Sequence, residues 1–170
     1  MDPGLRHAGI AGFENGVLQF AHLVENPEDS ERDARAWMAM ATEVMASLPP
    51  DFTNIERFVF EMPQVYITTR VKFGPKVDPD DLMQLVGVNG AVVARVGAWT
   101  HKKYQPRQWK PKLKKETHGP MILAALSEEE RGRIKPCAKS LRHNVLDGIG
   151  LGLFDLGRIN EKGESNFFSK

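Results

Sequence analysis

Three carboxylates stand at points of the sequence where a side chain could bind a metal ion. Asp2 opens an Asp-Pro-Gly turn, Glu61 ends the apolar run FVFE, and Asp147 lies in the stretch HNVLDGIGLGL. A carboxylate at the end of a buried strand is costly unless a cation or hydrogen bonds compensate its charge. Oxygen ligands without cysteine favour hard cations such as Mg²⁺ or Mn²⁺. One such acid alone is usually a surface or ion-pair residue, but the three together predict a metal site.

The stretch 139–158 predicts an amphipathic helix that carries one of these acids. On this helix Asp147 stands one turn after His143, and Asn144 could share the same face. Glycines at 148, 150 and 152 each cost about 1 kcal/mol relative to Ala in a helix interior. We therefore expect something large, or another backbone, to pass very close to them. The apolar stripe of the helix consists of Leu141, Val145, Ile149, Leu153 and Leu156.

Length and composition predict one cytoplasmic domain. The chain has 170 residues, of which 41% are hydrophobic, and this suffices for a single domain with its own core. The single cysteine, Cys137, excludes an intramolecular disulfide and a metal site built from cysteines. No apolar run approaches the roughly 20 residues of a membrane span, and the first residues lack the pattern of a signal peptide.

The near-neutral net charge hides an asymmetry along the chain. Residues 1–99 carry 8 Lys or Arg against 14 Asp or Glu, a balance of −6. Residues 100–142 carry 12 against 4, a balance of +8. A basic segment in an otherwise acidic protein indicates a face that binds a polyanion. On charge alone, a solvated lysine-rich surface is an equal alternative.

The pattern of turns and apolar runs predicts an α/β fold. Asn15-Gly16 predicts a tight hairpin, because both residues accept the positive φ angles of such turns. Ser30 is the expected N-cap of a Met- and Ala-rich helix that ends before Pro49. The elements expected after it are strand 55–62, helix 80–96 with Asp78 as its cap, strand 98–104, a basic loop or short helix 106–115, helix 117–126, a capping box of Ser127 with Glu130, and the final helix. The sheet should start antiparallel and become parallel after the first helix.

The three acidic motifs together resemble those of the RuvC-type Holliday junction resolvases of the ribonuclease H-like superfamily, particularly divergent phage and bacterial members. DPGLRHAGIAGF is similar to their first motif, FVFEMP to the second and HNVLDGIGLGL to the third. Their order and spacing fit over residues 1–158. The resemblance implies a mixed five-stranded sheet flanked by helices, with a nuclease domain at residues 1–160 and a frayed tail at 161–170.

The resemblance also implies roles for single residues. Asp2, Glu61 and Asp147 would hold two Mg²⁺ ions, for which Mn²⁺ can substitute, and these ions would activate water and stabilise the leaving 3′ oxygen of a phosphodiester. The family has a further acid or His about one turn before the last Asp. Here His143 is the preferred match and Asn144 the alternative. An ordinary structural role of His143 in the helix also stays open.

Basic and aromatic residues complete the expected site. Lys110 and Lys115 are the nearest matches to the family's lysines at the scissile phosphate, with Lys114 as an alternative to Lys115. Tyr66 is the closest match to an aromatic residue that wedges into the junction, and Phe73 is the alternative. The other residues expected to contact DNA are Lys102, Lys103, Arg107, Lys112 and Lys114.

The resemblance predicts an enzyme that cuts four-way DNA junctions. Such a junction is cut symmetrically on two strands, so we expect a homodimer, with helix 80–96 in part of its interface. The alternatives are a less selective flap or fork nuclease and a catalytically inactive DNA-binding module. The family has about five strand residues before the first Asp, whereas here Met1 precedes Asp2 directly. We therefore expect a shortened first strand and a marginally stable domain.

Overall fold

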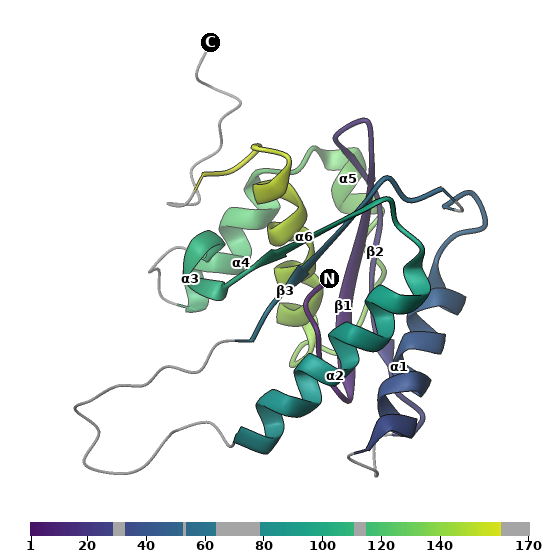
Figure 1. Cartoon of the computed structure of the whole chain (residues 1–170). Coiled ribbons are helices and arrows are strands. Elements are labelled where there is room, and N and C mark those ends of the chain that lie inside the picture. Colours follow the sequence, from purple (N-terminus) through teal and green to yellow (C-terminus); the bar gives the residue numbers. More distant parts are fainter. Residues whose placement is uncertain (29–32, 53, 64–78, 111–114, 161–170) are drawn as a thin grey trace, which may run out of the picture.

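The computed structural model describes residues 1–28, 33–52, 54–63, 79–110 and 115–160. A thin layer of strands separates two groups of helices (Figure 1). Helices α1 and α2 cover one face, and helix α6 with α3, α4 and α5 lies toward the other. The expected tail at 161–170 lies outside the described residues. No helix in the described part of the chain is long and apolar enough to cross a membrane.

The first of two two-stranded sheets is an antiparallel hairpin. Strand β1, His7–Glu14, pairs with strand β2, Val17–Glu25. The turn between them places Asn15 at φ 51° and Gly16 at φ 79°, as the Asn-Gly signal predicted. The register shifts between Gly12 and Phe13, which marks a bulge in β1.

The second two-stranded sheet is a parallel pair joined by a helical crossover. Strand β3, Arg57–Glu61, pairs with strand β4, Thr100–Tyr104, and helix α2, Pro79–Val96, connects them. The predicted order, antiparallel pairing before the first helix and parallel pairing after it, is therefore confirmed, but the two pairs form separate two-stranded sheets rather than one continuous sheet. The prediction of five strands is not confirmed, because the described residues form only four.

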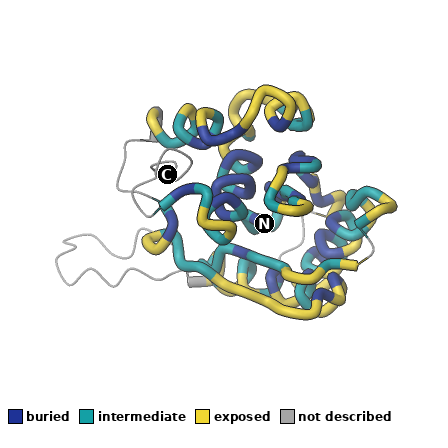
Figure 2. Tube along the Cα trace, turned by 90° about the horizontal axis from the view of Figure 1, so that it is seen from above, coloured by how far each residue is buried: buried dark blue, intermediate teal, exposed yellow. Residues whose placement is uncertain are grey.

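Met1 and Asp2 join the two sheets at the position where the fifth strand was expected. Asp2 forms an antiparallel bridge with Gly9 of β1 through two backbone hydrogen bonds of 2.8 and 3.0 Å. The amino group of Met1 donates to the carbonyl of Val59 at 2.7 Å, and the N–H of Glu61 donates to the carbonyl of Met1 at 3.1 Å. The N-terminus consequently lies in the middle of the molecule, between the hairpin and β3 (Figure 1, Figure 2).

Helix α1, Ala34–Ser47, begins later than the sequence predicted. Its N-cap is Asp33, whose carboxylate accepts from the backbone N–H groups of Arg35 and Ala36. The expected cap Ser30 lies outside the described residues, as does Asp78 before α2. An aspartate is as good a cap as a serine, so sequence alone did not separate the two. The core under α1 and α2 is formed by Met1, Ile10, Phe20, Met40, Val44, Phe60, Val88 and Val92.

Helix α6, Arg142–Asp155, packs across the opposite face of the hairpin with α4, Lys115–Ala124. The centre of the apolar stripe expected on this helix is buried, at Val145, Ile149 and Leu153. Leu156, its last residue, is 41% exposed because the helix ends at Asp155. The second core contains Leu18, Ala21, Ile122, Val145, Ile149, Leu153 and Ile159. Short helices α3, Pro106–Trp109, and α5, Glu128–Gly132, complete this side.

The glycines of α6 let the helix approach the sheet backbone. A Cβ atom on Gly148 would lie 2.7 Å from the carbonyl oxygen of Gly9, and one on Gly152 would overlap the ring of Phe13. The expected close approach of another backbone is thus confirmed. It brings Asp147, which is next to Gly148, over the bridge that holds Asp2.

A buried ion pair ties α5 to the rest of this side. Glu130 is 3% exposed and accepts hydrogen bonds from the backbone N–H groups of Leu18 at 2.9 Å and Ser127 at 2.8 Å. The guanidinium of Arg158 donates to the same carboxylate at 2.9 Å. The predicted capping box of Ser127 with Glu130 is present, and Glu130 also reaches the hairpin.

Candidate metal centre

Asp2, Glu61 and Asp147 come from three separate elements and gather around one lysine. The Nζ atom of Lys110 lies 3.1 Å from Oε2 of Glu61 and 2.9 Å from Oδ2 of Asp147. Asp2 interacts electrostatically with Lys110 and with both other acids. The structure therefore brings together four of the residues that the sequence singled out.

The backbone of the sheet positions two of the acids. Asp2 is held by its bridge to Gly9, and the carbonyl of Met1, one residue earlier, accepts from the N–H of Glu61. Met1 is anchored in turn by a side chain that is only 6% exposed. Asp2 and Glu61 thus sit on neighbouring strand positions, and α6 supplies Asp147 from the other layer.

Burial dominates the acid-base properties of Asp2. Desolvation raises the pKa of Asp2 from 3.8 to about 7, and the negative charges of Asp147 and Glu61 add to this effect. Lys110 acts in the opposite direction but does not cancel it. In the absence of an added cation, the site therefore favours the protonated form of Asp2.

Lys110 and Asp147 stabilise each other's charged forms. Burial lowers the pKa of Lys110, but Asp147, Glu61 and Asp2 more than offset this, and the net pKa is raised. Burial raises the pKa of Asp147, whereas the hydrogen bond from His118 and the charge of Lys110 outweigh it and leave the pKa lowered. The ammonium of Lys110 therefore lies between Glu61 and Asp147 and stabilises the charged form of Asp147.

The donor set of this cluster consists of carboxylates around a lysine. The described part of the chain contains no group of three or more Asp, Glu, His or Cys side chains placed to hold a metal ion. Between Glu61 and Asp147 the place of a cation is taken by the ammonium of Lys110. Carboxylate oxygens with a partly desolvated acid among them are the ligands that Mg²⁺ and Mn²⁺ prefer. The donor atoms are thus of the kind that such ions bind, but in this arrangement they hold Lys110, and a divalent ion remains a prediction.

Two side chains that the sequence reasoning missed orient the acids. The indole N–H of Trp109, which is fully buried, donates to Oε2 of Glu61 at 2.9 Å. Nδ1 of His118 lies 3.2 Å from Oδ1 of Asp147, and its ring stands 5.7 Å from that of Trp109. Nε2 of His118 is buried and has no hydrogen-bond partner among the described residues. The only sequence signal was that Trp109 precedes Lys110 and that His118 lies in the basic segment.

His143 is exposed in the first turn of α6, and the structure records no contact between it and the three acids. The neighbouring Asn144 packs its backbone carbonyl against Gly9. Among the described residues, the histidine that contacts the carboxylate of Asp147 is His118. The role expected for His143, or for Asn144 in its place, remains a prediction.

The residues expected to contact DNA differ in their surroundings. Nζ of Lys102 lies 2.7 Å from Oδ1 of Asp155 and 4.9 Å from the centre of the Tyr104 ring. Lys103 and Arg107 are exposed on β4 and α3, where Arg107 donates to Gln105. Lys115 begins α4, but its side chain is not described. The remaining predicted contacts lie outside the described residues, namely Tyr66, Phe73, Lys112 and Lys114.

The arrangement is a mixed α/β fold in which acids lie where the central strands and the last helix meet. The chain is similar in fold to the Thermus thermophilus RuvC structure, with a TM-score of 0.50 and 18% identity over 89% of this chain and 88% of that chain. T. thermophilus RuvC in complex with Holliday junction substrate aligns with a TM-score of 0.46 and 16% identity, over 89% of this chain and 87% of that chain. No family model and no curated protein matches the sequence. The chain therefore shares the fold of RuvC.

Proposed function

We propose that this protein is a metal-dependent endonuclease that cuts branched DNA, with four-way junctions as its principal substrate. The observation that carries the proposal is the convergence of Asp2, Glu61 and Asp147 on one cation, the ammonium of Lys110, within a RuvC fold. The basic segment 100–142, with its balance of +8, supplies a surface for the phosphate backbone.

The three acids would hold two Mg²⁺ ions, for which Mn²⁺ can substitute. When bound, such ions supply a water nucleophile of lowered pKa and stabilise the leaving 3′ oxygen. Trp109 and His118 fix the orientation of Glu61 and Asp147, so that the ligands are held before DNA arrives. Lys110, displaced from the acids, is the nearest described cation for a phosphate oxygen at the same place.

Two nicks at symmetric positions of a junction require two such sites, which supports a homodimer. Met83 on α2 is 62% exposed and Val86 on the same helix is 42% exposed. These side chains provide apolar surface on the helix that the sequence placed in the dimer interface. Size-exclusion chromatography with light scattering measures the oligomeric state directly.

A nicking assay on four-way junction, flap and linear duplex, with and without Mg²⁺, tests the function. The proposal expects Mg²⁺-dependent nicks placed symmetrically in the junction and little cleavage of the duplex. Comparable cleavage of flaps would favour the less selective nuclease. If the protein bound the junction but did not cleave it in Mg²⁺ or in Mn²⁺, it would be only a DNA-binding module, and the enzymatic proposal would be overturned.

A further inference from the structure

A segment between α5 and α6, residues 133–142, carries positive charge along the outer edge of the hairpin, and we call it the basic strap. Ile134 forms a parallel bridge with Ala21 of β2, and the N–H of Lys135 donates to the carbonyl of Ala21 at 2.9 Å. The strap then turns and enters the first turn of α6 at Arg142. Its side chains therefore project from a backbone that hydrogen bonds hold in place.

Most of the charge on the basic strap is not compensated within the protein. The strap contains four Lys or Arg and no Asp or Glu. Arg133 donates to a backbone carbonyl at 2.7 Å and pairs with a carboxylate of α5, so its role is structural. Lys135, Lys139 and Arg142 are exposed, and within the described ranges no carboxylate forms an ion pair with any of them. Three uncompensated cations on one ordered segment indicate a surface that binds an anion.

The basic strap and strand β4 form the two outer edges of one row of extended segments (Figure 1). The row runs from the strap through β2, β1, the bridge at Asp2 and β3 to β4. Neighbouring strands lie about 4.8 Å apart, so the five steps of this row span roughly 24 Å. Asp2 and Glu61 lie near its middle, whereas Lys103 lies on β4 and Arg107 on α3 directly after it. The candidate metal centre is therefore flanked by exposed cations on both sides.

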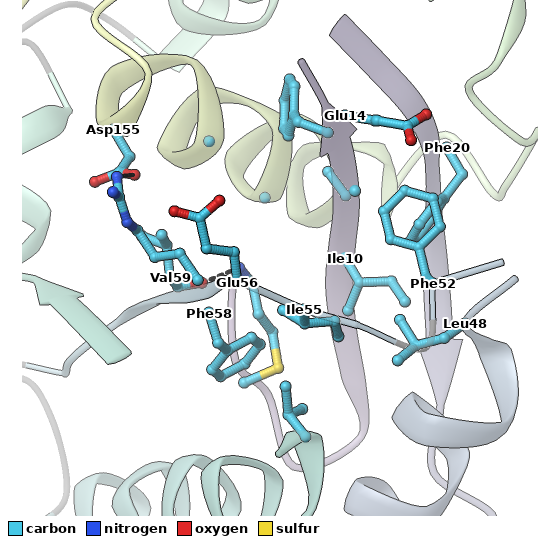
Figure 3. A pocket seen from close by; sticks show the side chains of 18 of the residues that line it. Ile10, Glu14, Phe20, Leu48, Phe52, Ile55, Glu56, Phe58, Val59 and Asp155 are labelled. Atoms are coloured by element: carbon cyan, nitrogen blue, oxygen red, sulfur yellow. Dashed lines mark hydrogen bonds and ion pairs between the residues drawn. The ribbon is translucent and has the colours of Figure 1, made fainter. Parts of the chain in front are cut away.

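The two ends of this row differ in charge. Where β1 ends and β3 begins, a cavity of about 490 Å³ is lined by apolar side chains and by Glu14 and Glu56 (Figure 3). These acids repel a phosphate backbone. At the other end, the carbonyl of Asn144 packs against Gly9, which is the bridge partner of Asp2, so α6 begins beside the metal centre. The strap thus meets α6, at Arg142, at the end of the row where DNA can reach the acids.

We propose that the basic strap is a second contact surface for DNA, which binds the phosphate backbone on the side of the metal centre away from β4. This inference rests on the proposed function, since it takes branched DNA as the ligand. The roughly 24 Å between the two edges corresponds to about seven base steps of roughly 3.4 Å. DNA whose branch point lies at the acids therefore places one arm along β4 and α3 and another along the strap.

The first test measures the salt dependence of junction binding in EDTA by fluorescence anisotropy. The strap variant carries Lys135→Gln and Lys139→Gln. Its matched control carries Arg35→Gln and Arg95→Gln, which remove the same charge from exposed positions on α1 and α2. The strap variant should reduce the slope of log affinity against log salt by about 1.8, because each lysine neutralises one phosphate and contributes about 0.9. The control should keep the parent's slope.

Combining the strap variant with Lys103→Ala and Arg107→Ala tests whether both edges hold the same DNA molecule. The reductions in slope should then add, because the contacts form simultaneously on one junction. A combined variant with no greater reduction than the strap variant alone would overturn the two-edge arrangement.

A second test locates the DNA directly. Ser140→Cys, in a chain that also carries Cys137→Ser, places a thiol-linked photocrosslinker on an exposed position of the strap. Ala46→Cys in the same background places it on an exposed position of α1. The strap reporter should give several times more covalent adduct with the junction than the α1 reporter.

An unchanged salt slope in the strap variant, or equal adduct from the two reporters, would overturn the proposal. Both readouts are taken without a divalent metal and measure binding alone. A strap variant with the parent's slope therefore refutes the strap even where the parent cleaves junctions. A reduced slope and a selective adduct support the strap even where the parent does not cleave, so this outcome is separate from that of the proposed nuclease activity.

Discussion

Nζ of Lys110 lies 2.9 Å from Oδ2 of Asp147, and it also lies 3.1 Å from Glu61. A lysine thus neutralises the carboxylates that would bind metal. A divalent ion bound as proposed would have to displace this ammonium from the same oxygens, which leads to the first prediction.

Lys110→Met should bind Mn²⁺ more tightly and cleave DNA more slowly. Removing the ammonium frees two carboxylates for the ion, and a roughly tenfold gain in affinity corresponds to about 1.4 kcal/mol. Calorimetric titration with Mn²⁺ measures the affinity, and single-turnover cleavage measures the rate. Lys103→Met is the control for the Mn²⁺ affinity only, because Lys103 is an exposed lysine with an expected DNA contact. Weaker Mn²⁺ binding by the Lys110 variant would show that Lys110 does not compete with metal.

Asp147→Asn and Glu61→Gln should each abolish junction cleavage while leaving junction affinity within about twofold. Each change removes one expected metal ligand but no positive surface. Gel-shift titration in Ca²⁺ and nicking in Mg²⁺ give the two readouts. Asp51→Asn, at an exposed acid outside the site, should cleave normally. Near-normal cleavage by either site variant would refute the two-metal proposal.

The exposed basic residues should set the salt dependence of DNA binding. Lys103→Ala and Arg107→Ala should each reduce the slope of log affinity against log salt by about 0.9 if each side chain contacts one phosphate. Lys102→Ala should instead lower the melting temperature, because Lys102 is paired with the buried carboxylate of Asp155. Fluorescence anisotropy at several salt concentrations and thermal melts separate the effects. If the variant that carries both Lys103→Ala and Arg107→Ala kept the parent's slope of log affinity against log salt, these residues would form only a solvated surface.

Asp2 should make the metal-free protein less stable as pH rises. Its pKa is raised to about 7 in the folded state, so between about pH 4 and pH 7 the folded state binds more protons than the unfolded one. The free energy of unfolding therefore falls over this window, by at most about 4 kcal/mol for a shift of this size. Asp2→Asn should remove the fall. Urea unfolding in EDTA from pH 4 to pH 8 measures it, and parallel profiles of both proteins would contradict the prediction.

Glu130 should have the opposite pH dependence. The hydrogen bond from Arg158 is the largest cause that lowers the pKa of Glu130 to about 2. Its contribution is present above the unfolded pKa near 4.5 and is lost as pH falls toward 2, with a size of about 3 kcal/mol. Glu130→Gln should lose this contribution at pH 7 but differ little from the parent near pH 2. A constant difference across the range would assign Glu130 a role that does not depend on its charge.

Local patterns in the sequence determined the elements and the order of the acids. The positive φ angles of Asn15-Gly16, the capping box at Ser127 and the glycines of α6 are all readable because each reflects the geometry of a few neighbouring residues. The same kind of reasoning missed Asp33 as the N-cap of α1, since a cap is one of several equivalent side chains near a helix start.

Only the tertiary structure decided which side chains complete the site. Spacing along α6 puts His143 and Asp147 one turn apart, but it does not determine which turn lies against the sheet, and His143 is exposed. Trp109 and His118 reach the acids because α3 and α4 pack beside α6, a contact between segments with no shared local pattern. The two-residue bridge of Met1 and Asp2 likewise depends on β1 and β3 meeting around it, since hydrogen bonds of a sheet join residues that are far apart in the chain.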